Sequence, residues 1–146
     1  MSRAAIAAAA VALAVAGCGG SSPSASRLRQ QTTHICQQTL AQSDRIRAPA
    51  LPSGTARFLR RGTDVLGPEL ARLRALRTPA DEAGAYSAAL TAESRELTML
   101  DGTIHELDDG ADAPSVIKAL QRRLAPAEFA ENAAWRTLGI PACASR

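Results

Sequence analysis

The chain has 146 residues and a formal net charge of +3, and its aromatic side chains are one Trp, one Tyr and two Phe. The length is that of one domain with a single core, and the abundance of alanine and leucine favours helices over strands. No alternating apolar run is bounded by a hairpin turn, so a sheet-based fold is not expected.

The first twenty residues have the pattern of a bacterial export signal. Arg3 gives a basic start, and an uncharged apolar stretch without proline runs from Ala4 to Ala16. This stretch is shorter than the roughly 20 apolar residues that an ordinary membrane-spanning helix needs. Small residues lie at its end, as they do at a signal-peptide cleavage site. The pattern therefore predicts an exported protein.

The end of this signal, Val15-Ala16-Gly17-Cys18, resembles the lipobox of bacterial lipoproteins: an aliphatic residue, two small residues and a cysteine. In that family the cysteine receives a diacylglyceryl group, and a peptidase cleaves just before it. The resemblance implies a cleaved signal peptide over residues 1–17 and a lipidated Cys18 that opens a flexible tether over residues 18–25. It also implies attachment to the extracytoplasmic face of the cell membrane, with inner and outer membrane both left open.

Ordinary secretion is the alternative, because Ala14-Val15-Ala16 also fits the small-x-small cleavage pattern of a soluble secreted protein. The cysteine count favours the lipoprotein. The chain has Cys18, Cys36 and Cys143, and an odd cysteine in an exported protein requires an explanation. Lipidation of Cys18 leaves a pair.

Residues 26–146 are expected to form one domain of four helices. The first helix runs from about residue 26 to residue 46, and a connection containing Pro49 and Pro52 follows it. The second helix starts near Thr55. The pair Gly67-Pro68 interrupts it, so we expect a kink or a break there.

The third helix is preceded by Thr78-Pro79-Ala80-Asp81, which is typical of a helix start, and it stops at Asp108-Asp109-Gly110. The fourth helix begins at Asp112 or Ala113 and bends near Pro126. Gly139 suits the left-handed position that closes a helix, with Ile140 free to pack back against it.

Four helices joined by short links predict an antiparallel up-down four-helix bundle, with proline-kinked second and fourth helices. In this topology the fourth helix returns toward the start of the first, which brings Cys143 near Cys36. A disulfide between them is permitted outside the cytoplasm, and closing a loop of about a hundred residues contributes nearly 5 kcal/mol in the chain-entropy model. A redox-active pair is the alternative, but such pairs typically use Cys-x-x-Cys.

A second resemblance covers most of the mature chain. A cysteine in the first helix, a Leu-x-x-Leu-x-x-Pro link (Leu73, Leu76, Pro79) and a terminal Leu-Gly-Ile-Pro-Ala-Cys are similar to small helical lipoproteins of high-GC Gram-positive bacteria. That group is largely uncharacterised. The resemblance therefore implies a fold and a compartment, and no activity.

Charge is distributed unevenly along the chain. From Arg27 to Arg77 there are ten arginines and three acidic residues, whereas residues from Thr78 to Arg146 include six basic and eleven acidic ones. A basic half could meet anionic head groups or an acidic partner. Alternatively, the two halves face each other within the bundle. The candidate partner-binding residues cluster on the second helix: Arg57, Arg60 and Arg61.

Two groups of side chains are candidate chemical sites. Asp101, His105 and Asp108 could share a helix face and ligate a metal. A solvated polar face is the favoured interpretation, because Ile104 and Leu107 take the core side of this helix and no Glu-x-x-His pair repeats elsewhere. Glu93 and Glu96 form a possible carboxylate pair on the third helix. Nucleophile elbows, zinc-protease motifs and phosphate loops are absent. We therefore expect a protein that is not an enzyme and holds no metal or cofactor.

The expected function is that of a lipid-anchored binding or accessory module of the cell envelope. Its expected partners are the membrane, through the lipid on Cys18, and an envelope protein. The alternative is a small-ligand or metal carrier with a site between helices opened by Pro68 and Pro126. Nucleic acid is not expected as a partner, because the protein is exported and has no groove-reading motif. The oligomeric state is left open.

Overall fold

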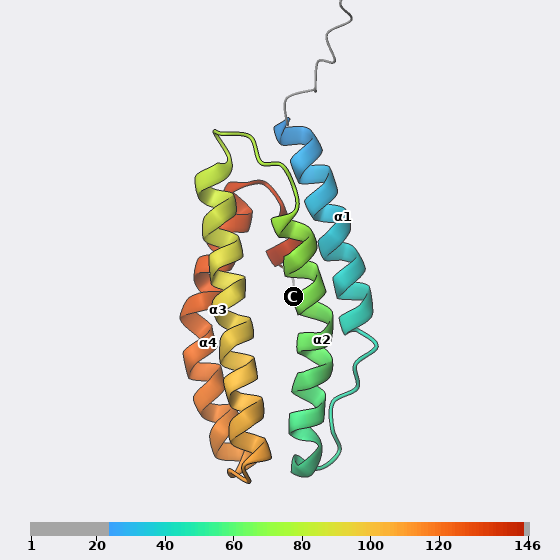
Figure 1. The fold of residues 1–146 in the computed structure, drawn as a ribbon, viewed down its shortest axis with the longest axis vertical. Helices are drawn as coiled ribbons and strands as arrows, with labels where there is room; N and C mark the ends of the chain where they lie inside the picture. Colours follow the sequence, from blue (N-terminus) through green and yellow to red (C-terminus); the bar gives the residue numbers. More distant parts are fainter. Residues whose placement is uncertain (1–23, 145–146) are drawn as a thin grey trace, which may run out of the picture.

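The computed structural model describes residues 24–144, which form four helices: α1 (Ala25–Ser43), α2 (Thr55–Arg74), α3 (Ala83–Asp108) and α4 (Ala113–Thr137). Two short 3-10 helices, η1 (Pro52–Gly54) and η2 (Pro141–Ala144), precede α2 and follow α4. The helices run alternately up and down (Figure 1), which confirms the predicted antiparallel bundle. Cys18 and the lipobox lie outside the described residues, as does most of the predicted tether.

Capping side chains set two of the helix starts. The Ser24 hydroxyl accepts a hydrogen bond from the backbone N–H of Arg27 at 3.3 Å and begins α1. The Asp112 carboxylate accepts one from the N–H of Ser115 at 3.1 Å and begins α4, as predicted. Hydrogen bonds to the side chain and backbone of Ser115 lower the pKa of Asp112.

Helix α3 begins later than predicted, at Ala83. The capping sequence 78–81 instead forms a turn, in which the N–H of Glu82 donates to the carbonyl of Pro79 at 3.1 Å. The Glu82 carboxylate is paired with Arg29 of α1, so residues 78–82 serve the link between helices rather than the helix itself. Helix α1 also ends three residues before the predicted position, at Ser43.

The two interior prolines do not divide their helices. Pro68 lies within α2 and Pro126 within α4, and each helix continues to its end. Gly139 adopts the predicted left-handed conformation, with φ of 69°. The N–H of Ile140 then donates to the carbonyl of Trp135 at 2.9 Å, and Ile140 is fully buried, as expected of this closing motif.

The core consists of two apolar clusters, and three buried glutamates lie between them along the helices. One cluster surrounds Trp135, whose ring meets Tyr86 edge to face at 5.7 Å between centroids. The other contains Leu59, Ile104 and Leu120 and lies toward the opposite end. Between these clusters, each of α2, α3 and α4 carries one buried acidic residue: Glu69, Glu93 and Glu131.

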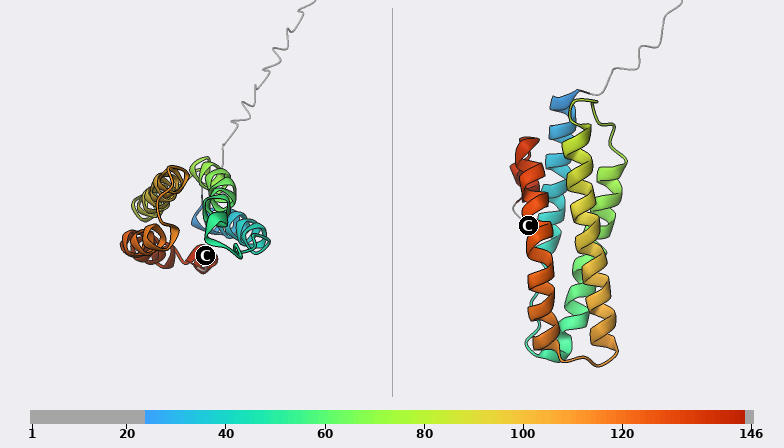
Figure 2. Two further views of the ribbon diagram at one scale, coloured as in Figure 1. Left: turned by 90° about the horizontal axis from the view of Figure 1, so that it is seen from below. Right: turned by 90° about the vertical axis from the view of Figure 1, so that its left-hand side faces the viewer.

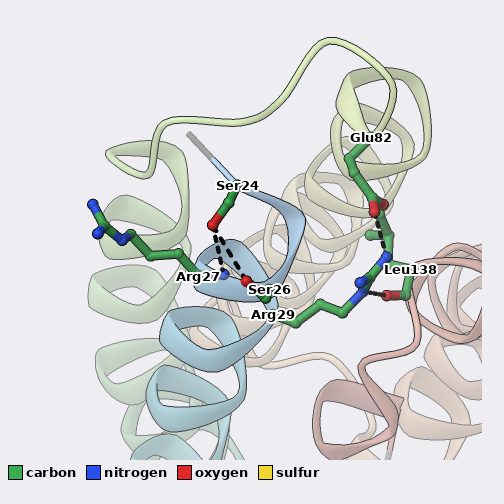
Figure 3. A network of polar contacts seen from close by, with 6 residues as sticks. All are labelled: Ser24, Ser26, Arg27, Arg29, Glu82 and Leu138. Atoms are coloured by element: carbon green, nitrogen blue, oxygen red, sulfur yellow. Dashed lines mark hydrogen bonds and ion pairs between the residues drawn. The ribbon is translucent and has the colours of Figure 1, made fainter. Parts of the chain in front are cut away.

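Helix α1 lies beside α2 (Figure 2), and η2 fills the space between α1 and α4. The predicted disulfide between Cys36 of α1 and Cys143 of η2 is present, with the two Cα atoms 5.2 Å apart. Arg29 adds a second link (Figure 3): its Nε donates to the carbonyl oxygen of Leu138 at 2.7 Å. Both links join the first helix to the end of the chain.

Candidate functional site: a basic hollow at one end of the bundle

The three arginines that the sequence singled out have different roles in the structure. Arg57, Arg60 and Arg61 are all exposed on the first turns of α2. Arg60 is paired with the carboxylate of Asp108, at the end of α3. Arg57 and Arg61 instead line a surface hollow of about 410 Å³. The structure therefore separates Arg60 from the other two.

The connection between α1 and α2 supplies the rest of this hollow. Arg47 contributes a third guanidinium, and Leu51 and Phe58 contribute apolar surface. Leu51 is 68% exposed, and among the described residues only Phe129 is another large hydrophobic side chain with comparable exposure. The hollow therefore combines three guanidinium groups with an exposed apolar side chain. We call Arg47, Leu51, Arg57 and Arg61 the basic hollow.

Close packing of the connection against itself gives the basic hollow its shape. Gly54 ends η1, and a Cβ atom at this position would lie 2.8 Å from the Cβ of Pro49. Only glycine allows this approach without displacing the loop. The loop position of Leu51 relative to the α2 arginines therefore depends on Gly54.

The basic hollow lies at the end of the bundle opposite to the start of α1. Helix α1 begins at one end in Figure 1, whereas the connection 44–54 and the start of α2 lie at the other.

Salt bridges elsewhere join the basic and acidic halves of the sequence, as in Arg29 with Glu82 and Arg60 with Asp108. Among the described residues, no salt bridge involves the three arginines of the basic hollow.

A partly open cavity of about 270 Å³ lies between the two apolar clusters. Carboxylates from two helices line it, together with leucines and Asn132: Glu93 and Glu96 of α3, and Glu128 and Glu131 of α4. Glu131 accepts a hydrogen bond from the indole nitrogen of Trp135 at 2.8 Å. The predicted pair Glu93 and Glu96 thus faces inward, with Glu93 only 2% exposed.

The remaining candidate groups are dispersed. Asp101, His105 and Asp108 are exposed, and Asp108 is engaged by Arg60. Across residues 24–144, no group of three His, Cys, Asp or Glu side chains has the arrangement of a metal site. None of the described helices is long and apolar enough to cross a membrane. Cys36 is held in the disulfide.

No known family, curated protein or solved structure matches this chain.

Sequence reasoning did not identify Arg47, Leu51, Glu128 or Glu131 as site residues. The first two lie in the connection between helices, where no periodicity relates them to Arg57 and Arg61. Glu131 could have been predicted from the sequence. It precedes Trp135 by one helical turn, so its carboxylate can accept a hydrogen bond from the indole N–H.

Proposed function

We propose that this protein is a lipid-anchored binding module of the bacterial cell envelope, and that the basic hollow binds an acidic segment of a partner protein. The anchor is supported by the lipobox sequence ending at Cys18. It is also supported by the cysteines of the described domain: Cys36 and Cys143 are bonded to each other, so lipidation of Cys18 gives all three a role. A disulfide of this kind is typical of an oxidising compartment.

The observation that carries the binding role is the convergence of Arg47, Arg57 and Arg61 around an exposed Leu51. Three positive charges attract an acidic chain and raise its association rate, and complementary charge provides specificity. Charges at the exposed rim of an interface add little binding energy. An apolar contact at Leu51, between the arginines, would add to it. The partner segment is therefore expected to contain several Asp or Glu residues around one apolar residue.

The position of the basic hollow suits this role. A lipid on Cys18 would tether the bundle near the start of α1, and the basic hollow is at the other end. The bilayer then leaves the basic hollow open to a neighbouring protein.

The carrier alternative has less support. Pro126 lines a surface hollow of about 770 Å³ between α3 and α4, but this hollow is open to solvent and its lining includes exposed residues such as Arg123 and Ala130. The glutamate-lined cavity of about 270 Å³ is below the lower limit of about 300 Å³ typical of ligand pockets. Glu93, Glu96 and Glu131, which line it, already take part in polar interactions within the protein. An enzyme would need a nucleophile or a base that faces a substrate-sized pocket. The predicted pair Glu93 and Glu96 lines only the smaller cavity, and Asp101, His105 and Asp108 are exposed. The exposed, charged hollow is the better-supported site.

Two experiments test the proposal. For the anchor, membrane fractions are prepared from cells that carry the native chain or Cys18→Ser, and the mass of the purified protein is measured. We expect a diacylglyceryl adduct and membrane retention only with Cys18. A mature chain that starts elsewhere, without lipid, would refute the anchor.

For the basic hollow, a photo-crosslinking amino acid replaces Leu51 in the cell. We expect one dominant adduct whose partner peptide is acidic, and its loss in Arg57→Gln/Arg61→Gln. The control is Arg60→Gln, which removes a charge from the same turns of α2 but outside the basic hollow. Crosslinks that persist in the double variant, or fall equally in the control, would count against this site.

A further inference from the structure

The outer face of α4 is a second surface with unusual chemistry. Lys118, Arg122, Phe129 and Arg136 are all exposed, and Phe129 is 76% exposed, the highest value among the large hydrophobic side chains described. Their spacings of four, seven and seven residues return to the same side of an α-helix. We call these four residues the α4 face. It extends over about 27 Å, because each residue adds about 1.5 Å.

The positive charges of the α4 face are not neutralised on the helix. The positions three and four residues away from Lys118, Arg122 and Arg136 contain no acidic residue. Within residues 24–144, none of the three takes part in a salt bridge. The face therefore presents three positive charges to whatever lies beside it.

The centre of the α4 face is apolar. Ala125, Pro126 and Ala133 are exposed around Phe129, so cationic side chains flank a small hydrophobic surface on both sides. Long basic side chains can extend toward head groups while an aromatic ring enters the boundary of the acyl region. A head-group surface can contact the cations and the ring together along the whole length of the face, about 27 Å.

We propose that the α4 face rests on an anionic phospholipid surface. This inference rests on the proposed anchor, because the anchor places the domain beside a bilayer. Cys18 precedes Ala25 by seven residues, a distance of at most about 25 Å when extended. This reach allows the bundle to lie along the same membrane that holds its lipid. The basic hollow would then face sideways, toward proteins in the membrane plane.

The test places a fluorescent reporter in the α4 face. Trp135, the single tryptophan, is fully buried and gives a constant background. The lipidated full-length protein with Phe129→Trp is reconstituted into vesicles of phosphatidylcholine alone or mixed with phosphatidylglycerol. Both preparations contain a trace of lipid with a nitroxide at the head group. We expect quenching of the added tryptophan in the anionic vesicles only, and no quenching for Ala88→Trp, an exposed position on α3.

Neutral substitutions then test the charges. In the Phe129→Trp chain, Lys118→Gln, Arg122→Gln and Arg136→Gln together should reduce occupancy of the lipid-contacting state on the order of 100-fold, since each basic residue near an anionic surface contributes about fivefold. The circular dichroism spectrum should stay unchanged, because these side chains are exposed. Equal quenching in both kinds of vesicle, no quenching in either, or no effect of the triple substitution would overturn the proposal.

The proposal of a lipid anchor and the proposal that the α4 face contacts lipid can be refuted separately. Absence of lipid from the purified mass refutes the anchor. The same tryptophan variant, mixed with preformed anionic vesicles, still reports on the face. Lipidation without quenching refutes the face and leaves the anchor intact.

Discussion

Arg29 donates a hydrogen bond from Nε to the carbonyl oxygen of Leu138, 2.7 Å away and 109 residues later in the sequence. Leu138 is the C-terminal cap of α4, where carbonyl groups lack partners within the helix and a positive charge is favourable. The other end of the same guanidinium pairs with Glu82, at the start of α3. One side chain of α1 thus holds the ends of two other helices (Figure 3).

Replacing Arg29 should therefore loosen the bundle at this end. We expect Arg29→Ala to lower the free energy of unfolding by about 1–2 kcal/mol, because a hydrogen bond from a charged donor contributes about 1.5–3 kcal/mol and the exposed part of the ion pair contributes little. Urea denaturation of the oxidised full chain measures the change. Arg29→Lys retains the charge but not the two-pronged geometry, so its stability should be intermediate. A variant as stable as the native chain would show that η2 and the disulfide hold this end alone.

Loss of the disulfide should lower the free energy of unfolding more than Arg29→Ala does. Cys36 and Cys143 are separated by 107 residues in sequence, and the chain-entropy model assigns about 4.7 kcal/mol to a loop of about 100 residues. Both cysteines are almost fully buried, so their replacement also disturbs packing. We expect Cys36→Ser/Cys143→Ser to lose about 2–5 kcal/mol relative to the oxidised chain.

Reductant provides the matched control for this prediction. Dithiothreitol should shift the urea midpoint of the native chain toward that of the double variant, and should leave the double variant unchanged. An unaltered midpoint for the native chain in reductant would mean that the bridge contributes no stability.

Gly54 tests whether the shape of the basic hollow matters as well as its charge. Gly54→Ala places a methyl group against Pro49, at a distance that requires the loop to move. We expect the photo-crosslink from position 51 to weaken several-fold although every arginine remains. Gly62→Ala is the control, since a Cβ there meets nothing within 4 Å and the position is inside α2. This control should increase stability by about 0.5–1 kcal/mol and leave the crosslink unchanged.

The sequence predicted the helices well because their signals are local. Asp112 caps α4, Gly139 closes it, and the periodic apolar residues identify the buried sides of the helices. The start of α3 was misplaced because a distant residue, Arg29, engages Glu82 and holds the preceding segment as a turn. Local capping signals carry no information about such a contact.

The candidate site was predicted only in part for the same reason. The proximity of Arg57, Arg60 and Arg61 on one helix predicts a basic surface. Arg60 does not contribute to the basic hollow, because it forms an ion pair with Asp108, 48 residues later in the sequence. Arg47 and Leu51 join the other two arginines only because the connection folds back against the start of α2. Charge clustering on a helix indicates where a basic surface begins, and tertiary contacts decide which charges remain available.

Tyr86, the single tyrosine, gives a prediction for alkaline pH. Its hydroxyl donates to the carbonyl of Leu73 at 2.9 Å, and burial raises its pKa above the ordinary value of 10.0, with the nearby Glu93 acting in the same direction. Above pH 10 the unfolded chain releases the phenolic proton while the folded chain retains it. The folded state then binds more protons, so the free energy of unfolding must fall as pH increases.

We therefore expect the urea midpoint to fall as pH rises above 10, and the tyrosinate absorbance of the folded chain to appear later than that of the urea-unfolded chain. Tyr86→Phe is the comparison, because it removes the titrating phenol and leaves every other titratable group in place. This variant should be less stable than the native chain at neutral pH, where it lacks the hydrogen bond to Leu73, by about 0.5–1.5 kcal/mol. The difference in free energy of unfolding between the native chain and this variant should decrease as pH rises through 10. A difference between the two chains that stays constant with pH would show that Tyr86 titrates in the folded protein as it does in the unfolded chain.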